Sequence, residues 1–156
     1  MDGDGVYELP VVRLLPTPEN LQPQSVSYVV NWQKFIPGES ATKTVCSTVY
    51  NSTDGYMLTL PEEWLKDNVT CRYDTESGTL TLYSVEKTEN TVTLGAALLR
   101  IRRYSKMEWE SLTETENYTA VYTQNNVIFA ATLSSPDSPL TLSLQGVSER
   151  IIPILE

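Results

Sequence analysis

Turn signals divide this chain into short segments rich in β-branched and aromatic residues, and this division constrains the fold more than any other feature. Asp54-Gly55 is the strongest hairpin signal, and 76–78 and 124–126 separate two further pairs of candidate strands. Two strands joined by so short a turn must run antiparallel. The sequence therefore predicts antiparallel hairpins as the main units of the fold.

The candidate strands share an enrichment in Val, Ile, Thr and Tyr, residues that suit a pleated, half-buried surface. In chain order they are 6–15, 25–32, 41–50, 56–60, 69–73, 79–85, 91–104, 118–123 and 127–133. The longest of them contains the apolar run 94–99, which shows little alternation. Such a run is typical of a central strand that is covered on both faces.

Three helices are expected between and after these strands. The first covers 60–66, where Pro61 suits the first helical position because its missing N–H would have no partner there. The second covers 105–112, where Ser105 and Glu108 have the spacing of a capping box. The third covers 139–155, because apolar residues recur there at spacings of three and four.

Length and charge limit the classes of protein that remain. The chain has 156 residues, which fits one domain, here 6–156, with 6–50 as its N-terminal strands and 1–5 as a flexible terminus. Its formal net charge is −9, a field that repels phosphate backbones, so no nucleic-acid partner is expected. Since the chain has no histidine, catalytic histidines and histidine-bound metals are excluded. We expect no catalytic residue, no metal and no cofactor.

Two cysteines, Cys46 and Cys71, are too few for a zinc site of their own and do not form a C-x-x-C motif. They either form a disulfide, as exported proteins often have, or remain two separate thiols in the core. The sequence leaves both alternatives open.

Three residues are candidates for contact with a ligand or partner. Trp32 lies beside polar residues and near a Pro-Gly turn, so its ring is either exposed for binding or packed in the core. Arg100 and Arg102 form the best local basic patch, together with Arg103, and are otherwise solvated or paired with carboxylates.

The stretch from Tyr56 to Trp64, with its Leu-Pro-Glu-Glu-Trp core, resembles the opening of small extracytoplasmic proteins from Gram-positive gut bacteria. The element order over 51–156 is similar too. The resemblance implies a PsbP/Mog1-like fold of the α+β class. This fold is an α/β/α sandwich, in which an antiparallel sheet has helices on both faces.

The resemblance and the composition together predict a non-enzymatic extracytoplasmic binding or interaction module, the soluble part of a lipoprotein. Its partner would be a protein or a cell-envelope ligand. Residues 1–5 read as a linker after a removed anchor or export signal, which would be its only link to a membrane. One alternative is a cytoplasmic immunity or adaptor protein. A hydrolase that uses carboxylates alone ranks lowest, because Glu62 and Glu63 are adjacent and do not converge on a helix.

Overall fold

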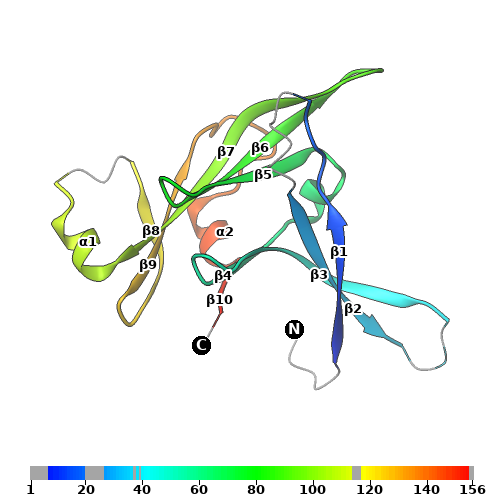
Figure 1. Cartoon of the computed structure of the whole chain (residues 1–156), viewed down its shortest axis with the longest axis horizontal. Helices are drawn as coiled ribbons and strands as arrows, with labels where there is room; N and C mark the ends of the chain where they lie inside the picture. Colours follow the sequence, from blue (N-terminus) through cyan, green and yellow to red (C-terminus); the bar gives the residue numbers. More distant parts are fainter. Residues whose placement is uncertain (1–6, 20–26, 37, 39, 114–116, 155–156) are drawn as a thin grey trace.

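The computed structural model describes residues 7–19, 27–36, 38, 40–113 and 117–154, which form two five-stranded antiparallel sheets that share one hydrophobic core (Figure 1). Sheet A has the strand order β1-β2-β3-β4-β10, with the bounds Glu8–Leu14, Tyr28–Phe35, Thr42–Asn51, Tyr56–Thr59 and Ile151–Pro153. Sheet B has the order β5-β6-β7-β9-β8, with the bounds Val69–Asp74, Thr79–Lys87, Val92–Ser105, Val127–Leu133 and Thr119–Gln124. The helical elements are η1, α1 and α2, with the bounds Glu62–Leu65, Lys106–Ser111 and Leu144–Ser148.

The core lies between the sheets because each sheet directs alternate side chains inward. Sheet A contributes Val29 and Leu58, and sheet B contributes Leu82 and Leu99, each 0–1% exposed. Trp64 of η1 inserts at one end, where it is 1% exposed and its indole N–H donates to the Leu140 carbonyl oxygen at 2.8 Å. That bond satisfies the one polar group of a ring buried mainly by apolar contact.

The three predicted hairpins are confirmed. The β3–β4, β5–β6 and β8–β9 turns each contain a residue with positive φ, namely Gly55 (78°), Gly78 (62°) and Asn125 (53°). The longest predicted strand is β7, and it lies at the centre of sheet B. Cover on both faces of the apolar run 94–99 was wrong in part, since Ala96 is exposed although Leu98 and Leu99 are each only 1% exposed.

The predicted helices have mixed outcomes. The helix at 105–112 is confirmed as α1, and both hydrogen bonds of the Ser105–Glu108 capping box are present. At 60–66 the chain makes a single 3-10 turn after Pro61. The helix predicted over 139–155 was wrong, because within 139–154, the described part of that range, only Leu144–Ser148 is α-helical and Ile151–Pro153 is a strand paired with β4.

The α+β prediction, a PsbP/Mog1-like sheet with helices on both faces, was also wrong. The structure is mostly β, with two sheets in place of one, and its two α-helices have six and five residues. The second sheet covers one of the two faces that the predicted helices were to cover. In the described part of the chain, neither helix has the length or hydrophobicity of a membrane span.

Candidate functional site

A cluster of polar side chains links the two sheets at the β3–β4 turn. Asp54 is 9% exposed, and its carboxylate accepts hydrogen bonds from the Asn51 amide nitrogen (2.9 Å) and the Tyr73 hydroxyl (3.0 Å). The backbone N–H of Asp54 donates to the Asn51 side-chain oxygen at 3.1 Å. Because Tyr73 belongs to β5 and the other two residues to sheet A or its turn, the cluster joins the sheets.

Two tyrosines beside this carboxylate are held in their neutral form. Burial, reinforced by Asp54, raises the pKa of Tyr73 to about 12. Burial also raises the pKa of Tyr56, whose ring packs on Phe129 with centroids 4.9 Å apart. The Tyr56 hydroxyl faces Asn51 but does not reach hydrogen-bond geometry with any described residue. Tyr73 therefore acts as a hydrogen-bond donor to Asp54 at physiological pH.

Among the hollows beside the cluster, two have Asp54 in their walls. One, of about 560 Å³, is lined by Asp54, Arg103 and several aromatic side chains. The other, of about 450 Å³, has Asp54, Glu76 and Glu108 in its wall. A general acid needs a carboxyl group with a raised pKa. The pKa of Glu108 is instead lowered, because its carboxylate accepts the Ser105 backbone N–H, and Asp54 is occupied by two donors. The arrangement suits polar binding better than acid–base chemistry.

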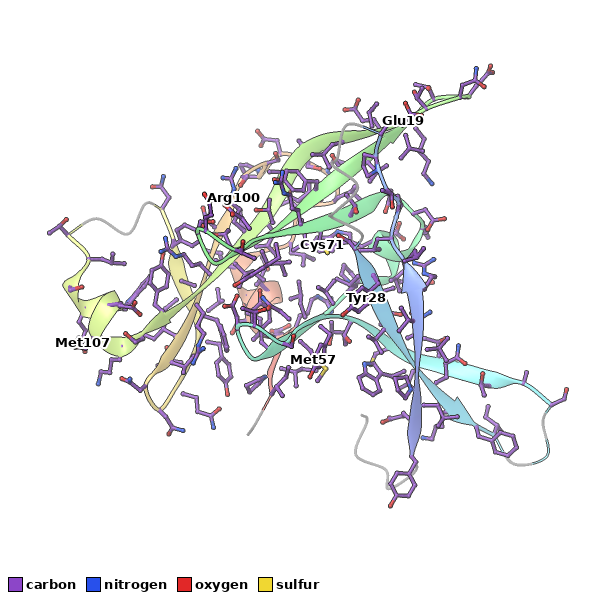
Figure 2. The ribbon with its side chains drawn as sticks, viewed as in Figure 1. Glu19, Tyr28, Met57, Cys71, Arg100 and Met107 are labelled. Carbon is purple, nitrogen blue, oxygen red and sulfur yellow. The ribbon has the colours of Figure 1, made fainter. Side chains whose placement is uncertain are left out.

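The structure separates the three arginines of β7 onto two faces. Arg100 pairs with Thr81 and Thr132 and lies on the outer face of sheet B, the side away from sheet A (Figure 2). Arg102 is on the same face, with its guanidinium 4.9 Å from the Tyr104 ring centroid. Arg103 is opposite Phe129 of the core, on the inner face, and lines the hollows at Asp54. The two residues predicted from the sequence are therefore together, and the third is not.

Trp32 lies on the outer face of sheet A. Its indole N–H donates to the Thr48 hydroxyl at 3.0 Å, and the ring is half-buried. The strand register places on this same face the exposed side chains Val12, Leu14 and Tyr28, which are 62%, 62% and 43% exposed. Trp32 is thus one part of an apolar and aromatic surface, and its contact with a partner stays a prediction.

Cys46 and Cys71 are on different sheets, and neither forms a disulfide. Cys46 is half-buried and opposite Trp32, on the outer face of sheet A. Cys71 is 5% exposed in the core, and burial raises the pKa of its thiol to about 11. The two thiols are separate in the structure, and of the two only Cys71 lies in the core.

No protein-family model, curated protein or solved structure matches this chain. The link to extracytoplasmic proteins of Gram-positive gut bacteria therefore stays a prediction from the Tyr56 to Trp64 motif, without the fold that it implied.

Sequence reasoning missed the cluster at Asp54 and the exposure of β1. Asp54 belongs to the predicted Asp-Gly turn, and Asn51 precedes it by three residues. Asn and Asp side chains commonly bond the backbone of such turns, so the sequence contains a signal for these two members of the cluster. Tyr73 comes from another hairpin in the other sheet, and no local pattern could have placed it there.

Proposed function

We propose that this chain is a non-catalytic, extracytoplasmic interaction module that binds an extended polypeptide segment along the free edge of β1. One observation carries the proposal: β1 is an edge strand whose apolar side chains are exposed. Leu9, Val11, Val12 and Leu14 are 56%, 42%, 62% and 62% exposed. An exposed apolar edge recruits other strands, and strand addition is a common mode of peptide recognition.

The backbone of β1 has hydrogen-bonding groups available at this edge. Leu15 donates its N–H to the Ser27 carbonyl oxygen at 2.9 Å, so Leu15 faces β2. Residues of an antiparallel strand alternate between facing the partner and facing away. Val12, opposite Val30, and Leu14 therefore direct their N–H and C=O groups away from β2. An added strand would bond these groups.

Both faces of β1 offer apolar contact beside those groups. Leu9 and Val11 lie on one face, and Val12 and Leu14 lie on the other. The ends of β1, β2 and β3 that lie away from the core extend beyond sheet B, so sheet B covers neither face of these ends (Figure 1). A partner strand with apolar side chains on both faces would remove this surface from water, at about 25 cal/mol per Å².

Prolines limit the length and the identity of the occupant. The backbone of Pro10 is oriented outward, like that of Val12, but it has no N–H to donate. Pro16 ends the stretch of backbone that can pair with an added strand on the other side. If the β1 strands of two copies paired antiparallel with Val12 opposite Val12, Pro10 of each copy would lie opposite Leu14 of the other. One backbone N–H donor would then be missing at each end of the pair. A short segment of a different polypeptide avoids this loss, so we assign the edge to such a partner.

The extracytoplasmic location rests on the resemblance of the motif from Tyr56 to Trp64 alone. The alternative, a cytoplasmic immunity or adaptor protein, would use the same edge. The absence of a disulfide between Cys46 and Cys71 favours this alternative. Cell fractionation of the natural gene product distinguishes the two. Recovery in the cytoplasm would leave strand addition in place and remove the extracytoplasmic part of the proposal.

Strand addition can be tested with a random peptide library panned on the immobilised protein, followed by affinity measurement of the enriched peptides. Val12→Pro deletes an outward N–H without deleting a β1–β2 hydrogen bond, whereas the matched control Val12→Thr keeps that N–H. We expect Val12→Pro to weaken peptide binding about tenfold or more and Val12→Thr to have a smaller effect. Circular dichroism and urea unfolding check that both variants fold.

Three results would overturn the assignment. The first is that no peptide is enriched. The second is that the enriched peptides bind Val12→Pro as tightly as the unsubstituted protein. The third is a concentration-dependent dimer that Val12→Pro abolishes, which would give the edge to a second copy. A further variant, Val12→Lys, repeats the test with a charge on the edge if Val12→Pro does not fold.

A further inference from the structure

We propose that the outer face of sheet B is a second, independent binding site, which takes a small saccharide that carries an oxyanion, either a carboxylate or a phosphate. The site is a hollow of about 740 Å³ whose walls include Arg72, Arg100, Tyr83 and Tyr118 and whose floor includes Thr81. We call it the arginine groove. It lies on the far side of the molecule's core from sheet A, so it does not depend on strand addition at β1.

The strand register brings the two arginines together. Arg72 of β5 and Arg100 of β7 are both opposite Thr81 of the intervening strand β6. Neighbouring strands are about 4.8 Å apart, so the two arginine backbones lie about 10 Å apart across Thr81. Guanidinium groups on side chains of this length can reach one oxyanion between them. Thr81 is only 7% exposed although it is on an outer face, as expected beneath long neighbouring side chains.

The arginines of the groove keep their hydrogen-bonding capacity. Ion pairs within the described residues include those of Arg13, Lys66 and Lys106, none of which lines the groove. The nearest carboxylate along β5, Asp74, is engaged by its own turn. It accepts the Glu76 backbone N–H at 3.0 Å and the Ser77 hydroxyl at 2.8 Å. The pKa of Asp74 is lowered chiefly by the Ser77 hydroxyl and to a smaller extent by the charge of Arg72. Neither Arg72 nor Arg100 has a carboxylate within ion-pair distance in the described part of the chain.

The lining residues define the chemistry of the ligand. Arginine matches the geometry of carboxylates and phosphates through two parallel N–H bonds. Thr79 and Thr81 supply hydroxyl groups, and the half-buried rings of Tyr83 and Tyr118 supply apolar surface on which a sugar ring can stack.

Charge limits the size of the ligand. The net charge of −9 disfavours a long polyanion. Asp74 and Glu76 also line the groove and would repel a second anionic group near them. A single oxyanion on an otherwise neutral sugar meets both conditions.

An amide NMR titration tests the proposal with four probes: glucuronate, glucose-6-phosphate, glucose and inorganic phosphate. We expect glucuronate or glucose-6-phosphate to shift the amide signals of Arg72, Thr81 and Arg100, and glucose to leave them unchanged. Arg100→Gln should raise the dissociation constant about tenfold or more. The matched control is Arg103→Gln, which removes the same charge from the same strand on the opposite face and should leave the affinity unchanged.

The outcomes separate the sources of the oxyanion. Binding of glucuronate alone assigns a uronic acid, binding of glucose-6-phosphate alone assigns a sugar phosphate, and either supports the site. If inorganic phosphate bound as tightly as glucose-6-phosphate, the claim that the site recognises a saccharide would be overturned. If glucose bound as tightly as the anionic sugars, the claim that the site requires an oxyanion would be overturned. Absence of binding by every probe would overturn the assignment of the arginine groove as a binding site. A loss of affinity in Arg103→Gln equal to that in Arg100→Gln would overturn it too. Val12→Pro should not change the result, which separates this test from that of β1.

Discussion

Replacing Asp54 by alanine tests whether the polar cluster between the sheets stabilises the fold. In Asp54→Ala, the Tyr73 hydroxyl and the Asn51 amide each lose the acceptor that they now contact at 3.0 and 2.9 Å. Hydrogen bonds to a charged group contribute about 1.5–3 kcal/mol each. Asn51 is 7% exposed, which favours the upper part of that range, and Tyr73 is half-buried, which favours the lower part. We therefore expect a loss of about 3–5 kcal/mol, from the two bonds together.

Urea unfolding measures this loss, with tryptophan fluorescence as the signal. A double-mutant cycle of Asp54→Ala with Tyr73→Phe isolates the bond between the sheets and should give a coupling free energy of about 1 kcal/mol or more. The matched control is Asp137→Ala, which removes an exposed carboxylate and should change stability by less than about 0.5 kcal/mol. A loss below about 1 kcal/mol in Asp54→Ala, or a coupling of zero, would refute the reasoning.

Three further predictions concern single positions. A Cβ at Gly95 would lie 3.0 Å from the Ser84 carbonyl oxygen, so Gly95→Ala should cost about 1–3 kcal/mol in urea unfolding, and Ala96→Ser at the exposed neighbour much less. Ser105→Ala removes the hydroxyl that accepts the Glu108 N–H at 3.1 Å and should cost about 1 kcal/mol, whereas Glu108→Gln keeps a capping-box residue and should cost less. The pKa of Cys71 is raised from 9.0 to about 11, so its contribution to stability is complete below pH 9.0 and lost as the pH rises towards 11. Unfolding measured across that window should show a shallower pH dependence in Cys71→Ala, and identical slopes would contradict the assignment.

The elements that the sequence predicted correctly are those fixed by neighbouring residues. Asp54-Gly55 predicts a hairpin because glycine adopts the positive φ that the turn needs, and the Ser105–Glu108 capping box acts within one turn of helix. The helix predicted over 139–155 failed for a physical reason. Leu140, Val147 and Ile151 have helical spacing, yet they reach the same core from a loop, a helix and a strand.

The candidate site shows the same limit. Alternation along β7 could have placed Arg100 and Arg102 on one face and Arg103 on the other, because side chains of a strand alternate. The position of Arg72 beside Arg100 depends on the pairing order β5-β6-β7, and the link from Asp54 to Tyr73 depends on how two sheets pack. Neither the pairing order of these strands nor the packing of the two sheets produces a pattern in any single stretch of sequence.

The last strand has a consequence for the order of folding. Every strand of sheet B lies in the sequence between β4 and β10, two strands that pair side by side in sheet A. Bringing Ile151 to Leu58 closes a very long loop, whose entropic cost falls once the intervening chain is compact. Sheet B should therefore fold first, and β10 should join β4 last. Until then β4 is a second bare edge of sheet A, and the nascent chain is most exposed to mispairing late in its synthesis.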